Sequence, residues 1–274
     1  MGTSVKAPAA LVREEILALN AYHVAPAAGM VKLDAMENPY VLPPDISAEL
    51  GDLIAGTPLN RYPDPTAPTL RVRLREAFDI PADCELLIGN GSDEIITMVT
   101  QTLARPDAVM LAPEPSFAMY RMNAIYSRMR YVGVPLADDF SLDAGRFLAA
   151  VREHQPALTF IAYPNNPTGN LFAERDVEAI IEASPGFVVV DEAYHAFAGK
   201  SFMDRLARYS NLMVMRTVSK LGLAGIRLGY AVARPEWIRE FDKLRPPYNV
   251  NVLTQAVAGR ALERLDVLNA QAAR

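Results

Sequence analysis

The chain has 274 residues, enough for one large domain or two modest ones with a substantial hydrophobic core. With 51% hydrophobic residues and a formal net charge of −5, it is not expected to bind nucleic acid or an anionic membrane. One cysteine, Cys84, and three histidines form a poor metal-ligand set. Because no apolar run reaches transmembrane length and the first ten residues lack a signal-peptide core, we expect a cytoplasmic protein without a metal.

The expected elements begin with a short amphipathic helix over residues 11–19 and an irregular, proline-rich arm over 38–68. From residue 69 onward, short β-type runs alternate with longer helical patterns. The expected strands cover 85–88, 108–112, 130–135, 157–163, 187–190, 212–217 and 228–233. The expected helices include 92–104, 116–127, 143–154 and 173–183, and residues 250–274 indicate one long terminal helix.

Several of these strands, such as "FVVV" at 187–190, are apolar at every residue, which is typical of strands covered on both faces. Alternating strands and helices then predict an α/β fold with a mostly parallel sheet and helices on both faces. Ligands of such sheets lie beyond the carboxyl ends of the strands. The residues that follow each apolar run are therefore the candidates for chemistry.

The first such segment is "LLIGNGSDEII" at 86–96, which reads as strand, glycine-rich turn and helix. Backbone amides at Gly91, Ser92 and Asp93 would open a helix N-terminus, where a phosphate can bind. An ordinary helix cap is the alternative, and on this segment alone it is the stronger interpretation.

Two further segments place polar side chains at strand ends. "FIAYPNNPTGN" at 160–170 carries the amides Asn165 and Asn166, which can bind a ligand oxygen without adding charge. "FVVVDEAYHAF" at 187–197 carries Asp191 and Glu192, which predict a buried anion for a ligand cation, and Tyr194 can share that pocket. For His195 of the same segment, a packing role is favoured over a catalytic one.

The segment "MRTVSKLGLAGIRLGY" at 215–230 places Ser219, Lys220 and Arg227 after another strand. Lys220 is either a solvated strand cap or a buried amine with a lowered pKa that attacks a carbonyl. Serine and arginine are good phosphate ligands. Phosphate ligands, a buried acid, an amide, a tyrosine and an amine together suit a phosphorylated aldehyde with a cationic ring, pyridoxal 5′-phosphate (PLP).

"PNNPTG", "VVVDEAY" and "SKLGLAGIRLGY", in this order, resemble the fold-type-I PLP-dependent aminotransferases of the aspartate aminotransferase superfamily. Within it, the chain is most similar to the histidinol-phosphate aminotransferases, through "LNAYHV", "KLDAMENPY", "LNRYPDP", "GNGSDE", "PSFAMY" and "LRPPYNVN". The resemblance covers the chain from about residue 10 and implies a transaminase of L-histidinol phosphate and 2-oxoglutarate in L-histidine biosynthesis.

For the reacting centre, the resemblance implies that Lys220 forms the imine with PLP and later carries the proton. It implies that Asp191 keeps the pyridine nitrogen protonated. Asn166 and Tyr194 would bind the phenolic oxygen of the ring. Phe117 would stack on the ring, where many relatives carry tyrosine.

For the outer parts of the site, the resemblance implies a phosphate held by the amides of residues 91–93, the Ser219 hydroxyl and Arg227. Tyr62 would reach the phosphate in the neighbouring subunit, which implies a homodimer with shared active sites. Tyr22 and Asn38 would contact the small-molecule substrate.

The resemblance also implies a domain division: an N-terminal arm with part of a small domain over 1–45, a large PLP-binding domain over 46–250, and a linking helix over 251–274. Relatives continue into a small C-terminal domain whose arginine binds the substrate, so we expect that domain to be absent from this chain. Two alternatives stay open. One is a different fold-type-I enzyme, such as an aromatic aminotransferase or a threonine-phosphate decarboxylase, and the other is a non-catalytic PLP-binding fragment.

Overall fold

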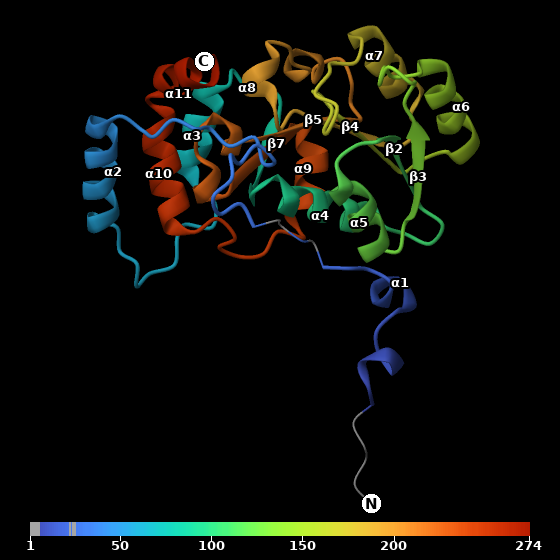
Figure 1. The fold of residues 1–274 in the computed structure, drawn as a ribbon, viewed down its shortest axis with the longest axis horizontal. Helices are drawn as coiled ribbons and strands as arrows, with labels where there is room; N and C mark the ends of the chain where they lie inside the picture. The colour runs from blue at the N-terminus through green and yellow to red at the C-terminus, as the bar shows by residue number, and fades with distance from the viewer. Residues whose placement is uncertain (1–5, 22, 24–25) are drawn as a thin grey trace, which may run out of the picture.

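A computed structural model describes residues 6–21, 23 and 26–274, which form a seven-stranded sheet covered by helices (Figure 1). The strands are β1 (Glu85–Asn90), β2 (Val109–Glu114), β3 (Arg130–Pro135), β4 (Leu158–Ala162), β5 (Phe187–Asp191), β6 (Leu212–Thr217) and β7 (Leu228–Ala233). Their order is β1-β7-β6-β5-β4-β2-β3. Strands β2 to β6 pair in parallel, whereas β7 pairs antiparallel with both β1 and β6. The expected α/β fold with a mostly parallel sheet is confirmed.

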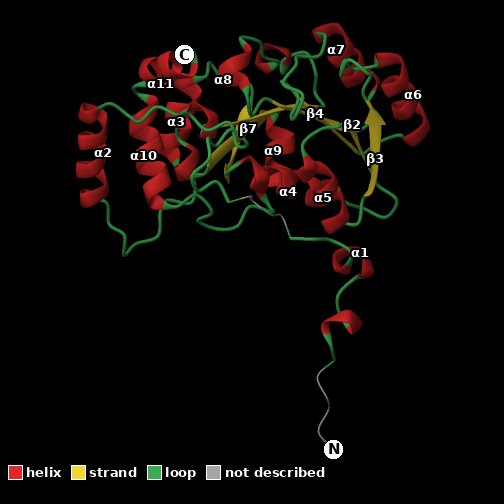
Figure 2. Cartoon of the chain, in the orientation of Figure 1, coloured by secondary structure: helices red, strands yellow, loops and turns green. Residues whose placement is uncertain are grey.

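Helices pack around the sheet, and several of them connect one strand to the next (Figure 2). They are α1 (Glu14–Leu17), α2 (Pro44–Gly56), α3 (Pro68–Ala77), α4 (Ser92–Leu103), α5 (Ala118–Tyr126), α6 (Ala144–His154), α7 (Glu174–Ala183), α8 (His195–Ala198), α9 (Pro235–Asp242), α10 (Val252–Leu262) and α11 (Leu265–Ala272). Short 3₁₀ turns include η3 (Ser219–Leu221) and η4 (Ala224–Ile226). Within the described residues, no helix has both the length and the hydropathy for a membrane crossing.

The alternation of side chains along each strand divides the core into two layers. On β5, Val188 and Val190 pack with α3, α6, α7 and α10 on one face of the sheet. Phe187 and Val189 pack with α4, α5 and α9 on the other face. The same alternation decides on which side the polar residues at the strand ends lie.

The proline-rich segment was expected to be irregular, but it contains the 13-residue helix α2. Pro43 is the N-cap and Pro44 the first helical residue, positions where a missing backbone N–H breaks no helical hydrogen bond. The helix is stabilised from outside, because Ile46 and Leu50 are buried against Val257 of α10. The expectation of an irregular arm was therefore wrong for residues 44–56.

Two other expectations need correction. The terminal helix is divided into α10 and α11, because Arg264 has φ −115° and ψ 35°, outside the helical region. The turn allows Leu268 to be buried and Gln271 to donate to the Val41 carbonyl at 2.9 Å. The helix expected over 11–19 is limited to one turn, Glu14–Leu17.

Gly229 allows β7 to pack against the turn that begins α4. A Cβ atom at this position would lie 2.5 Å from both the carbonyl carbon of Gly91 and the backbone nitrogen of Ser92. These are backbone atoms of the turn, which cannot move without displacing the start of α4.

We therefore expect Gly229→Ala to lower the free energy of unfolding by about 2 kcal/mol, the usual range for overpacking a tight interior. Chemical denaturation of the purified chain measures this difference. Gly225→Ala is the matched control, since a Cβ at Gly225 meets no atom within 4 Å. Equal stability of the Gly229 variant and the wild type would contradict the close packing.

Candidate active site

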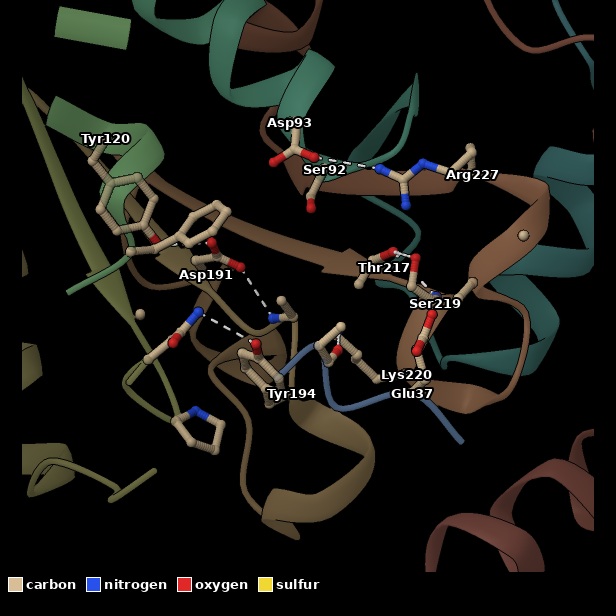
Figure 3. Close-up of a pocket in the computed structure, with 18 residues that line it drawn as sticks. Glu37, Ser92, Asp93, Tyr120, Asp191, Tyr194, Thr217, Ser219, Lys220 and Arg227 are labelled. Carbon is tan, nitrogen blue, oxygen red and sulfur yellow. Dashed lines mark hydrogen bonds and ion pairs between the residues drawn. The ribbon is translucent and has the colours of Figure 1, made fainter. Parts of the chain in front are cut away.

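A cavity of about 390 Å³ lies at one edge of the sheet (Figure 3). It is at the carboxyl ends of β4, β5 and β6 and at the start of α4. Strand β1 runs in the same direction as β6, because each pairs antiparallel with β7, so the turn after β1 reaches the same edge. The cavity brings together nine of the residues proposed from sequence: Ser92, Asp93, Phe117, Asn166, Asp191, Tyr194, Ser219, Lys220 and Arg227.

Asp191 is the last residue of β5 and is only 4% exposed. Its Oδ2 accepts a hydrogen bond from the Tyr120 hydroxyl at 2.6 Å, and its Oδ1 accepts one from the Ala193 N–H at 3.0 Å. Burial raises the pKa of Asp191 to about 6, although these hydrogen bonds oppose the rise. The carboxylate is suited to a cation inside the cavity.

Asn166 and Tyr194 approach each other from the ends of β4 and β5. The Asn166 Nδ2 atom donates to the Tyr194 hydroxyl at 3.3 Å. Both side chains line the same cavity as Asp191, and Figure 3 shows Tyr194 and Asp191 in it. Together they present an amide and a hydroxyl to one oxygen of a bound molecule.

Lys220 follows β6 in the short turn η3 and is partly buried. Its Nζ atom donates to the Ala35 carbonyl and lies 5.3 Å from the centre of the Tyr194 ring. Loss of hydration lowers the pKa of Lys220, and this effect exceeds the opposing influence of the Glu37 carboxylate. The interpretation as a nucleophilic amine inside a pocket is therefore favoured over the solvated strand cap.

The start of α4 and Arg227 form a concave surface on another side of the cavity (Figure 3). Gly91, the N-cap, has φ +82°, and a Cβ there would lie 2.6 Å from the Arg227 Nη2 atom. The amides of the first helical turn have no partner within the helix and point toward this surface. Arg227 Nη2 also pairs with the Asp93 carboxylate at 3.3 Å. The Asp93 side chain therefore orients the guanidinium, and the backbone N–H of Asp93 is one of the amides in the first turn of α4.

Ser219 completes this surface from η3. Its Oγ atom lies 2.8 Å from the Thr217 Oγ1 atom, and the Thr217 hydroxyl is also 3.0 Å from the Leu228 carbonyl. Its backbone N–H also donates to Thr217 Oγ1, at 3.2 Å. The hydroxyl is therefore held at the cavity wall by the ends of two neighbouring strands, β6 and β7.

Some residues singled out in the sequence have structural roles instead. Asn165 is buried in its own turn, where it bonds Ser116 at 2.9 Å and Thr168 at 2.8 Å. Glu192 points to the opposite face of the sheet, where it forms a buried ion pair with Arg216 at 2.8 Å. Of the two carboxylates, only Asp191 faces the cavity.

His195 lies next to this ion pair rather than in the cavity. Its ring packs edge-on against Phe78 with centroids 5.6 Å apart, and its Nδ1 atom is 3.2 Å from the Glu192 carbonyl. Burial lowers the pKa of His195 to about 3, so the ring is neutral near pH 7. This environment fits the packing role expected from the sequence.

Two of the more distant candidates, Tyr62 and Asn38, do not line the cavity, and a third cannot be placed. Tyr62 is 81% exposed and stacks on Tyr248 at a centroid distance of 4.5 Å. Asn38 donates to Gln271 of α11 at 3.0 Å and lines an adjoining hollow that also reaches Lys220. Tyr22 lies outside the described residues.

Sequence reasoning missed three polar side chains that line the cavity: Glu37, Tyr120 and Thr217. Tyr120 is three residues after Phe117, a spacing that places both rings on one side of α5. Glu37 is in the "KLDAMENPY" segment and Thr217 is the last residue of β6. The helical spacing could have revealed Tyr120, but Glu37 enters the site only through the path of an irregular segment.

Because the pKa of Asp191 is higher in the folded chain than in the unfolded chain, the folded state binds the extra proton between about pH 4 and pH 6. We expect the cofactor-free chain to lose about 3 kcal/mol of unfolding free energy across this window as the buried carboxyl ionises. Denaturation at pH 4, 6 and 8 measures the loss.

Asp191→Asn is the matched variant, since it retains the shape and does not titrate. The stability difference between the variant and the wild type should grow as pH rises through the window and stay constant above it. A pH-independent difference would mean that Asp191 has an ordinary pKa.

Comparison with known proteins identifies the family of the chain. The family model "Aminotransferase class I and II" matches residues 28–272. A histidinol-phosphate aminotransferase of Chromobacterium violaceum is 60% identical over 263 residues, covering 96% of this chain and 74% of the relative. Histidinol-phosphate aminotransferase 2 of Cupriavidus pinatubonensis is 55% identical over 268 residues, covering 96% and 73%.

Solved structures show the same fold. The histidinol-phosphate aminotransferase of Sinorhizobium meliloti, in complex with pyridoxal-5′-phosphate, superposes with a TM-score of 0.84 at 26% identity, covering 96% of this chain and 74% of that one. An aspartate aminotransferase variant of Thermus thermophilus superposes with a TM-score of 0.79 at 20% identity, covering 96% and 74%. With the cavity described above, these findings place the chain in the class I and II aminotransferase family, among relatives of histidinol-phosphate aminotransferases.

Proposed function

We propose that this protein is a PLP-dependent aminotransferase that transfers the amino group of L-histidinol phosphate to 2-oxoglutarate. The products are imidazole-acetol phosphate and L-glutamate, and the pathway is L-histidine biosynthesis. The observation that carries the catalytic part is the shared cavity of Lys220, Asp191 and the start of α4. The substrate follows from 60% identity to the Chromobacterium violaceum histidinol-phosphate aminotransferase.

The residues of the cavity fit PLP group by group. Asp191 is a buried carboxylate that forms no ion pair within the described part of the chain, which suits the cationic ring nitrogen. The Gly91 turn is shaped so that a side chain there would collide with Arg227, which suits the close approach of a phosphate. Phe117 lines the same cavity and supplies an apolar ring for the cofactor to stack on.

When bound, PLP supplies an aldehyde that captures amino groups and a cationic ring that accepts electrons from them. The Lys220 amine would hold the aldehyde and would carry the proton of the substrate α-carbon, a task for which a lowered pKa is favourable. Asp191 would hold the proton on the ring nitrogen. The Asn166 amide and the Tyr194 hydroxyl would orient the phenolic oxygen, and Ser219 and Arg227 would bind the phosphate.

The finer parts of the proposal concern assembly and location. Exposed Tyr62 would complete the phosphate site of a second copy, which makes the protein a homodimer with shared active sites. Asn38 and Tyr22 would contact the substrate, and residues 46–250 would form the cofactor-binding domain. A cytoplasmic location belongs to the same proposal.

We expect the wild-type chain with PLP to form glutamate from histidinol phosphate and 2-oxoglutarate, and Lys220→Ala to reduce this rate at least about 100-fold, as loss of an acid–base group does. A coupled glutamate assay measures the rate. Borohydride reduction followed by peptide mapping should place the pyridoxyl label on Lys220.

The control is Lys243→Ala, because Lys243 is exposed and its ion pair among the described residues is with Glu240 on the surface. It should keep both the label and the rate. A label on another lysine would contradict the site. Faster turnover of an aromatic amino acid, or decarboxylation of threonine phosphate, would contradict the proposed substrate but not the proposed cofactor site.

Mixed dimers test the role of Tyr62. Tyr62→Phe should weaken PLP binding about tenfold, the effect of losing one hydrogen bond to a charged group. In a dimer of one Lys220→Ala subunit and one Tyr62→Phe subunit, a shared site predicts one site with wild-type affinity. Fluorescence titration of PLP against the mixed dimer measures it. If the remaining intact lysine binds PLP with the weakened affinity, Tyr62 acts within its own subunit and the shared site is wrong.

A further inference from the structure

The Tyr120 hydroxyl donates a hydrogen bond to the Asp191 carboxylate (Figure 3). Its hydroxyl lies 2.6 Å from Asp191 Oδ2, and its side chain has no exposed surface. No ion pair to Asp191 forms among the residues that the structure describes, so only hydrogen bonds oppose the cost of burying its charge.

The position of the Tyr120 ring is fixed on two sides. The ring stacks on Phe160 of β4 with centroids 4.5 Å apart and an interplanar angle of 9°. Phe117 meets it edge-on at 5.7 Å and 85°. These two ring contacts therefore hold the Tyr120 hydroxyl where it reaches Asp191.

The helix that carries Tyr120 is also tied to the phosphate-binding side of the cavity. Thr97 of α4 donates to the Asn123 amide oxygen at 2.8 Å, and Asn123 donates to the Met119 carbonyl at 2.9 Å. Asn123 is fully buried. These bonds hold α5 against α4 and so fix the position of Tyr120 relative to the start of α4.

The proton in this contact belongs to the tyrosine. Burial and the neighbouring carboxylate raise the pKa of Tyr120 well above its usual value, so the hydroxyl only donates to the ionised Asp191. Two nearby carboxylates work against ionisation of Asp191: Asp93 at the start of α4 and Glu192 after β5 both raise its pKa. The hydrogen bonds from Tyr120 and from the Ala193 N–H lower it.

We propose that Tyr120 is a positioning residue, whose hydroxyl keeps Asp191 ionised and aimed at the ring nitrogen and thereby sets the lower pH limit for holding PLP. The proposal rests on the proposed function, because it needs PLP in this cavity. Tyr120 contributes no group to the chemistry of the substrate, and it acts only through the carboxylate.

The test is Tyr120→Phe, which retains the ring and removes only the hydroxyl. The midpoint of the pH dependence of the PLP dissociation constant should rise by about one unit, the change that one charge-assisted hydrogen bond produces. At pH 9, where Asp191 is ionised in both proteins, the two dissociation constants should agree within about twofold. Titration of ¹³C-labelled aspartate in the cofactor-free chain, assigned with Asp191→Asn, should show the same rise without PLP.

Two controls separate this role from a merely structural one. Tyr126→Phe changes another tyrosine of α5, which is 42% exposed, and should leave the pH profile unchanged. In the Asp191→Asn background, Tyr120→Phe should produce no further shift in the midpoint. A shift that persists in this background would overturn the proposal, because the hydroxyl would then act independently of Asp191.

The outcomes also distinguish this proposal from the proposed function. If the wild type binds PLP at Lys220 and Tyr120→Phe leaves both the binding profile and the Asp191 titration unchanged, the role of Tyr120 is wrong and the function stands. If the wild type does not bind PLP at all, the function fails, and the proposal fails with it.

Discussion

The burial of one carboxylate at the end of β5 is the constraint on which the site depends. Asp191 and Glu192 are consecutive, and the pleat of the strand sends them to opposite faces of the sheet. Glu192 finds Arg216, Ser201 and the Phe202 amide on its side and becomes part of the core. Asp191 meets only neutral donors among the residues that the structure describes, and it remains available to a cation. A shift of one residue in the register of β5 would exchange the two roles.

The cost of burying Asp191 explains the composition of its surroundings. A charge without an ionic partner raises the free energy of the folded chain unless donors are arranged around it. Tyr120 is such a donor, and its own ring is held by Phe160 and Phe117. The aromatic cluster on the α5 side therefore serves both the core and the site. A bound cation would balance the charge of this carboxylate.

A second constraint is the close contact between β7 and the turn before α4. Gly229 and Gly91 both lack side chains where a Cβ would collide with neighbouring atoms. As a result, the start of α4 lies beside Arg227, which has φ +53° at the end of η4. Lys220, Ser219 and Arg227 all follow β6 within one loop, so the amine and the phosphate ligands are positioned by the same edge of the sheet.

The sequence by itself determined the strands, the parallel sheet and the polar residues at its carboxyl edge, because these follow from apolar runs and from the residues directly after them. It could not decide what depends on distant partners. Helix α2 is stabilised because Ile46 and Leu50 pack against α10. The prolines at its start led to the expectation of an irregular segment. Glu37 enters the cavity from an irregular segment far along the chain from Asp191 and Lys220. Only the tertiary structure brings such groups together, since no local sequence pattern specifies a contact with a distant segment.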